Sequence, residues 1–121
     1  FLATLLSREV QHEAVVIARK FPNLHLFGCW WFTNTPQLID EITRMRMELL
    51  GTSFTPQHSD ARVLDQLIYK WRHTRERLVP ILAARYADLA ASGWHVTEQE
   101  MRRDVAELLG GAFDRFVASA R

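Results

Sequence analysis

Residues 24–32 form a nearly continuous run of apolar and aromatic side chains. A strand that is buried on both faces has this composition, and such strands are typical of parallel sheets covered by helices. We therefore predict a buried strand here, and a second, shorter strand from Ser53 to Thr55. Parallel strands need long crossover connections, so this run restricts the fold class more than any other feature.

Apolar residues with helical spacing flank both predicted strands. They predict a helix over residues 2–20, which ends at Phe21 because the residue before a proline disfavours the α region. A second helix is predicted from Pro36 to Leu50, with Thr35 as its N-cap and Gly51 as its stop.

Helical spacing resumes at Val63 and continues to Leu89, and Pro80 is expected to kink this helix or to begin a new one. The segment from Thr97 to Glu100 has the pattern of a capping box and predicts another helix. Gly110-Gly111 should end that helix, leaving a short amphipathic turn that holds Phe113, Phe116 and Val117.

This order of elements predicts an α/β fold that is rich in helix. Two parallel strands alone leave unpaired edges, which favour association with other strands. Residues 1–121 are therefore predicted to be the C-terminal portion of a single (β/α)₈ TIM-type barrel domain, made of its last two strands and the helices that follow. The absence of an initiating methionine before Phe1 adds the expectation of a fragment or a trimmed piece.

Composition and charge narrow the class of protein. A chain of 121 residues with 48% hydrophobic residues is long and apolar enough to bury a core. A net charge of +1 argues against a nucleic-acid partner, and no apolar run is long enough for a membrane span. The single cysteine, Cys29, rules out an internal disulfide and fits a reducing compartment, so we expect a cytoplasmic protein.

The segment after the second predicted strand, residues 58–62, carries the best candidates for chemistry. Ligands gather at the carboxyl ends of strands in parallel α/β folds. Asp60 can ligate a divalent metal or accept a proton there, although it would serve equally well as a helix N-cap. Arg62 can bind an anionic substrate, or it can be a surface arginine or a partner of Asp60. His58 is a weaker metal candidate, with a supporting structural role as the alternative.

Trp30 and Trp31 end the first predicted strand and should point to opposite sides of it. One of them would then face the site as a wall for a sugar, while the alternative is that both are core residues. His25 lies early in the same strand and is expected to be structural. Cys29 has no base nearby in the sequence, so we do not expect a nucleophile.

Several segments in combination resemble the C-terminal part of the uronate isomerase family. The resemblance covers nearly the whole chain, and its motifs are specific only when taken together. The segments are residues 26–32, 41–51, 58–62, 67–71 and 104–111.

The resemblance implies a metal-dependent (β/α)₈ barrel of the amidohydrolase superfamily that interconverts D-glucuronate with D-fructuronate and D-galacturonate with D-tagaturonate. It implies that Asp60 serves the metal centre and proton transfer, that Arg62 contacts the substrate, and that at least one of Trp30 and Trp31 lines the sugar site. Zinc is expected only because it is the usual metal of the superfamily, and a homo-oligomer is expected as well. The family's His-x-His metal pair and a further substrate-binding arginine lie in regions that this chain lacks, so we expect the chain alone to be inactive.

Two other functions fit the same residues. A hydrolase of the same superfamily would use a metal-bound hydroxide on a carbonyl and would not exchange aldose for ketose. A non-catalytic helical module would instead use its exposed strands and the tryptophan pair to bind a partner.

Overall fold

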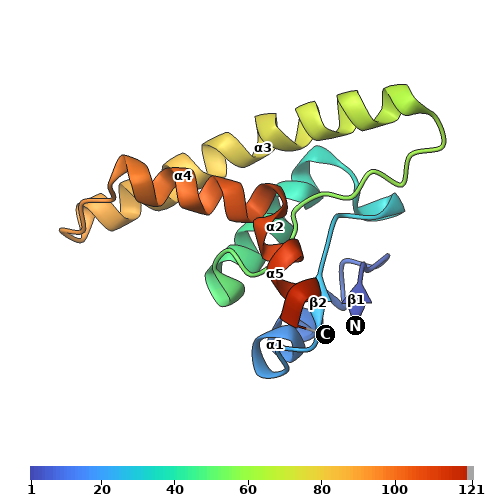
Figure 1. Cartoon of the computed structure of the whole chain (residues 1–121), viewed down its shortest axis with the longest axis horizontal. Coiled ribbons are helices and arrows are strands. Elements are labelled where there is room, and N and C mark those ends of the chain that lie inside the picture. The colour runs from blue at the N-terminus through green and yellow to red at the C-terminus, as the bar shows by residue number, and fades with distance from the viewer. Residues whose placement is uncertain (120–121) are drawn as a thin grey trace.

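The computed structural model describes residues 1–119, most of which are helical (Figure 1). The predicted helix-rich class is confirmed. No helix in this part of the chain is both long and apolar enough to cross a membrane. In chain order the elements are β1 (Leu2–Ala3), α1 (Gln11–Lys20), β2 (His25–Leu26), η1 (Trp31–Thr33), α2 (Pro36–Leu50), α3 (Leu64–Ala91), α4 (Glu98–Ala106), η2 (Glu107–Gly111) and α5 (Ala112–Ser119).

Three short parallel segments lie side by side in the order in which they occur in the chain. β1 pairs with β2 in parallel, and Phe27, directly after β2, forms a parallel bridge with Thr55. The bridge rests on hydrogen bonds from Thr55 N to Leu26 O at 3.1 Å and from Gly28 N to Thr55 O at 2.8 Å. Helix α1 connects the first segment to the second, and α2 connects the second to the third. This is the repeated crossover arrangement that parallel sheets require.

The prediction of a helix over residues 2–20 was wrong in its first half. Leu2–Ala3 is a strand, and the helix begins only at Gln11. The apolar spacing of the first residues fits a helix, but their backbone is engaged by β2: His25 N donates to Phe1 O at 2.9 Å, and Phe27 N donates to Ala3 O at 3.0 Å. The sequence therefore predicted two parallel segments where the structure has three.

The two predicted strands are also shorter in the structure than in the prediction. β2 ends at Leu26, and the second strand is reduced to the single bridge at Thr55. Gly28 takes a φ of +63° and turns the chain out of the extended conformation, and Trp31 follows with a φ of +48°. The prediction that Trp30 and Trp31 alternate across a strand was therefore wrong, because both lie beyond the end of β2.

The longer helices follow their local signals more closely. Helix α2 has Pro36 in its first turn and ends before Gly51, which has a φ of +60°. Helix α3 runs through Pro80 without a break, so no new helix begins there. A proline inside a helix removes one backbone hydrogen bond. Several helical turns lie on each side of Pro80, and their hydrogen bonds keep α3 continuous past the missing one.

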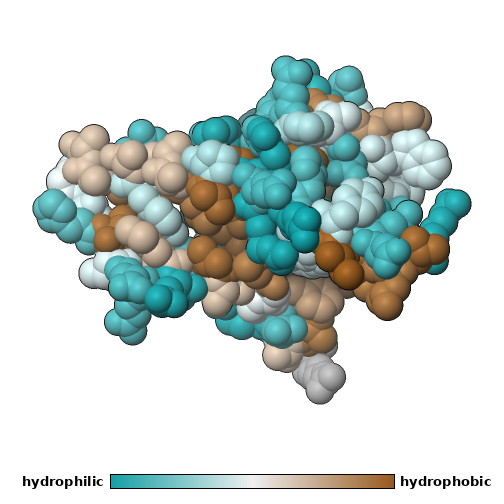
Figure 2. Space-filling view, turned by 90° about the horizontal axis from the view of Figure 1, so that it is seen from above, coloured by the Kyte–Doolittle hydropathy of each residue, from teal (hydrophilic) through white to brown (hydrophobic). Residues whose placement is uncertain are grey.

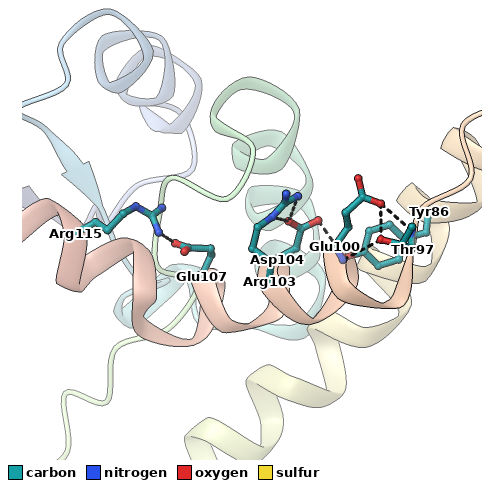
Figure 3. A network of polar contacts seen from close by, with 7 residues as sticks. All are labelled: Tyr86, Thr97, Glu100, Arg103, Asp104, Glu107 and Arg115. Carbon is teal, nitrogen blue, oxygen red and sulfur yellow. Dashed lines mark hydrogen bonds and ion pairs between the residues drawn. The ribbon is translucent and has the colours of Figure 1, made fainter.

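The predicted capping box begins α4. Glu100 N donates to Thr97 Oγ1 at 3.2 Å, and Thr97 N donates to Glu100 Oε2 at 2.8 Å (Figure 3). Farther along, Tyr86 of α3 donates from its hydroxyl to Asp104 Oδ2 at 3.4 Å, which ties α4 to α3. After α4, Gly110 of η2 breaks the helical backbone with a φ of +146°, as the Gly-Gly pair predicted. The prediction of only a short turn after this pair was wrong, because α5 is a helix of 8 residues.

The core is divided between two clusters. Phe54 and Leu108 are fully buried together with Leu78 and Leu82 of α3, whereas Cys29 packs with Ile39 and Ile42 of α2. Other large apolar side chains stay at the surface, where Figure 2 shows hydrophobic atoms beside hydrophilic ones. The most exposed are Phe1 at 85%, Leu64 at 75% and Phe32 at 70%.

Candidate functional site

The carboxyl ends of the three parallel segments bring the predicted site residues together. Trp30 follows β2, while His58 and Asp60 follow the bridge at Thr55. The indole N–H of Trp30 donates to Asp60 Oδ2 at 3.2 Å, and Thr4, directly after β1, places its Oγ1 3.5 Å from His58 Nε2. Residues more than fifty positions apart in the sequence therefore meet at one end of the sheet.

Asp60 does not cap the helix that follows it. The N-cap of α3 is Val63, and no side chain accepts a cap hydrogen bond there. Asp60 instead has a φ of +41°, a conformation that non-glycine residues rarely adopt, and its exposed carboxylate accepts from Trp30. Backbone strain of this kind concentrates at functional sites. Because Val63 is the N-cap of α3, the alternative of a helix cap is excluded, and a site role for Asp60 stays a prediction.

Arg62 is exposed, and its side chain points to no acidic partner among residues 1–119: no ion pair joins it to Asp60. Its backbone N–H donates to Gln66 Oε1 at 2.7 Å, which anchors the entry into α3. The predicted pairing with Asp60 is absent from this part of the chain. The exposed position fits the alternative of a surface arginine, and anion binding by the guanidinium stays a prediction.

The two tryptophans have different surroundings. Trp30 is half-buried and holds the Asp60 carboxylate, whereas Trp31 is 58% exposed. Their rings meet edge to face with centroids 6.4 Å apart, and Phe32 extends this arrangement with a centroid 5.9 Å from that of Trp31. Aromatic rings beside a carboxylate provide apolar surface of the kind against which a sugar packs.

His58 is held against the turn at Gly28. A Cβ atom on Gly28 would lie only 1.9 Å from His58 Cδ2, so the imidazole occupies the space that glycine leaves free. Phe27 packs edge to face on the same ring at 5.1 Å. Burial lowers the pKa of His58, while the nearby Asp60 carboxylate opposes that change. Burial thus favours the neutral imidazole, which is the form able to ligate a metal.

A metal centre requires more ligands than this site provides. Within residues 1–119, no three His, Cys, Asp or Glu side chains lie close enough together to hold a metal ion. Asp60 offers a carboxylate with one oxygen engaged by Trp30, and His58 offers a ring nitrogen near Thr4. These donors suit a divalent ion only as a contribution to a larger set.

The buried face of α2 carries a residue that the sequence reasoning missed. Arg46 is 1% exposed, and it donates from Nη1 to Gly28 O at 2.8 Å and from Nη2 to Gln11 Oε1 at 3.1 Å. The sequence carried a signal for this burial, because Ile39, Ile42 and Arg46 have the spacing of one helix face.

Lys70 of α3 is a second residue that the sequence reasoning missed. It donates to Ser59 O and holds the segment before Asp60.

His25 and Cys29, for which no catalytic role was predicted, are both buried. His25 is buried, and its Nε2 lies 2.9 Å from Thr55 Oγ1 across the sheet. Phe116 of α5 covers the same ring at 5.1 Å. Burial raises the pKa of the Cys29 thiol, so the reactive thiolate is disfavoured.

Comparison with known proteins relates these features to an enzyme. The crystal structure of a uronate isomerase from Bacillus halodurans C-125 matches this chain with a TM-score of 0.94 and 62% sequence identity, over 98% of this chain and 28% of that one. The chain thus spans just over a quarter of the length of that protein. Neither a protein-family model nor a curated protein matches the chain. Along nearly its whole length the chain is similar to one segment of a uronate isomerase, and the resemblance predicted from its motifs is confirmed.

Proposed function

We propose that this chain is the C-terminal barrel segment of a uronate isomerase that interconverts D-glucuronate with D-fructuronate and D-galacturonate with D-tagaturonate. The observation that carries the proposal is the 62% identity to a uronate isomerase over 98% of the chain, at a TM-score of 0.94. At that identity, a segment with the same fold is expected to contribute the same part of the site.

The three consecutive parallel segments support a (β/α)₈ barrel. β1, β2 and the bridge at Thr55 are linked by helices in the manner of adjacent barrel strands, and β1 and Thr55 lie at the two edges. Closing a barrel would pair both edges with strands from the rest of the enzyme. Phe1 and Leu2, both exposed, lie at one of these edges.

In the proposed reaction a proton moves between C2 of the aldose and C1 of the ketose through an enediol. The Asp60 carboxylate would take the proton from C2 and deliver it to C1, while the hydroxyl proton on O2 passes to O1, so that no atom is gained or lost. Trp30 would orient that carboxylate through its indole N–H. Arg62 would bind the carboxylate of the uronic acid with two parallel hydrogen bonds, and Trp31 would pack on the sugar.

A divalent metal, with zinc as the proposed ion, would stabilise the oxyanion charge that develops during the reaction. Asp60 is the ligand that we propose from this chain. The other ligands would come from the rest of the enzyme, which we propose forms a homo-oligomer in the cytoplasm. Because those other metal ligands would lie outside the 121-residue chain, we expect the chain alone to show no turnover.

The test is isomerase activity of the full-length enzyme on D-glucuronate and D-galacturonate, with Asp60→Asn as the variant. General acid–base catalysis contributes about 10²- to 10⁴-fold to a rate, so we expect kcat to fall by roughly that factor. Asp65→Asn is the matched control, because Asp65 is an exposed aspartate in the first turn of α3. Equal activity of the two variants would contradict the role of Asp60. A folded, metal-loaded enzyme without isomerase activity would contradict the proposed function and favour a hydrolase.

A further inference from the structure

The buried arginine of α2 has an unusual environment. Arg46 is 1% exposed, its Nε has no hydrogen-bond partner, and no carboxylate within residues 1–119 forms an ion pair with it. Burying a charge without a counter-charge is unfavourable, and apolar side chains of similar volume commonly replace buried ionic groups without loss of stability. Core packing alone therefore gives little reason for an arginine at this position.

The hydrogen bonds of Arg46 suggest another role. Its guanidinium connects the turn after β2 with the start of α1, through Gly28 O at 2.8 Å and Gln11 Oε1 at 3.1 Å. Gln11 in turn donates from Nε2 to Ser7 O at 3.1 Å, in the segment that follows β1. One buried side chain thus ties α2 to the segments that leave two neighbouring strands.

Gly28 is the point at which this network reaches the candidate site. Its N–H donates to Thr55 O at 2.8 Å, its carbonyl accepts from Arg46, and its Cα faces the ring of His58. The peptide unit before Gly28 is therefore held by Thr55, and the peptide unit after it is held by Arg46. Trp30 is only two residues further along, and its indole N–H holds Asp60 at 3.2 Å.

We propose that Arg46 is a positioning residue, which fixes the Gly28 turn and thereby aims the Trp30 indole at the Asp60 carboxylate. The consequence for turnover rests on the proposed isomerase function, whereas the consequence for the orientation of Trp30 does not. Arg46 makes no hydrogen bond to Trp30 or Asp60, and its hydrogen bonds go to the Gly28 carbonyl and the Gln11 side chain. It acts through the backbone.

The test uses the full-length enzyme with 5-fluorotryptophan incorporated and the ¹⁹F resonance of Trp30 assigned by Trp30→Phe. Arg46→Met keeps an unbranched apolar side chain that fills most of the buried space and removes both hydrogen bonds. Arg44→Met is the matched control, because Arg44 lies on the same helix, is only partly buried, and makes no hydrogen bond or ion pair among residues 1–119. We expect Arg46→Met to shift or broaden the Trp30 resonance and to lower kcat by about three- to tenfold, as much as loss of the Trp30 donor itself. Arg44→Met should do neither.

Arg46→Lys and Gln11→Ala keep the test decisive if Arg46→Met does not fold. Each removes only part of the hydrogen-bond network of Arg46. Each should therefore move the Trp30 resonance by less than Arg46→Met does, and should lower kcat by about two- to fivefold. A lower melting temperature with an unchanged Trp30 resonance and an unchanged kcat would overturn the proposal and leave Arg46 with a structural role only. If the unsubstituted enzyme has no isomerase activity, the proposed function fails, but the Trp30 resonance still decides whether Arg46 positions this side chain.

Discussion

Replacing Gly28 by alanine tests how tightly the turn after β2 is packed against the site. The substitution adds one methyl group to a residue whose φ is +63°, and that methyl would lie 1.9 Å from His58 Cδ2 and 2.8 Å from His58 Nε2. The imidazole is not free to leave, since Phe27 packs on it at 5.1 Å. Gly51 offers a matched control, because it has nearly the same φ, +60°, and no atom within 4 Å of the corresponding position.

The expected free energies of unfolding differ between the two glycines. A left-handed conformation costs a residue with a Cβ about 1–2 kcal/mol, and the lower entropy of the unfolded alanine chain offsets about 0.4–1 kcal/mol of that cost. Gly51, whose ψ of −122° lies outside the left-handed helical region, carries instead the cost of a sparsely populated conformation, so Gly51→Ala should lower the free energy of unfolding by about 1–3 kcal/mol with no steric clash. Forcing an extra carbon into a packed site typically costs a further 1–3 kcal/mol, so Gly28→Ala should lower it by about 2–4 kcal/mol.

Denaturant unfolding of the full-length enzyme, followed by circular dichroism, measures both values. The double variant Gly28→Ala/His58→Ala completes a double-mutant cycle, because removing the imidazole opens the space that the new methyl group needs. We expect the double variant to lose about 1–3 kcal/mol less than the sum of the two single variants, which is the cost of the clash with His58. No such recovery would refute the reasoning.

Three further substitutions probe other parts of the structure. Burial lowers the pKa of His25 below its unfolded value of about 6.5. The neutral, buried His25 therefore contributes stability above that pH, and this contribution is lost as the pH falls toward the folded-state pKa. His25→Gln should make the melting temperature fall less steeply below about pH 6.5. Thr97→Ala removes the capping box and should destabilise the start of α4 by about 1 kcal/mol, seen as faster amide exchange at Glu100. Trp30→Phe keeps a ring but removes the donor to Asp60, and should lower kcat by about three- to tenfold, measured by steady-state kinetics.

Each of these variants has a control in the chain. His12→Gln replaces an exposed histidine on α1, and a pH dependence that changes equally in both histidine variants would contradict the role of His25. Trp94→Phe replaces a tryptophan that is 60% exposed and distant in sequence from the site, and should leave kcat unchanged. Unchanged exchange at Glu100 in Thr97→Ala would show that the cap does not hold the helix end.

Local signals predicted the helices well and the strands poorly. Pro36, Gly51 and the Thr97 capping box act within one turn of helix, so the sequence shows them directly. β1 has only two residues, and a segment that short has no periodicity to detect. The turn at Gly28 depends on His58, which is thirty residues away, so the sequence alone could not show that the strand ends before Trp30.

The candidate site was predicted in part for a general reason. Asp60 and Trp30 each follow a parallel segment, and the ends of parallel segments converge, so their contact follows from topology. Arg46 was missed because it lies inside α2, away from the strand ends at which site residues were predicted. Its spacing from Ile39 nevertheless places it on the buried face of that helix. The substrate contact of Arg62 and metal binding by Asp60 stay predictions.

The parallel pairing of the strands also sets an order of assembly. Each pairing, of Leu2 with His25 and of Phe27 with Thr55, closes a loop of roughly 25 residues, and closing such a loop costs about 3 kcal/mol of chain entropy before any contact repays it. Helices form faster than loops of this kind become stable, and α1 and α2 shorten the distance that the chain ends must search. The segment is therefore expected to fold by adding one strand after another along the chain, each waiting for the helix that precedes it.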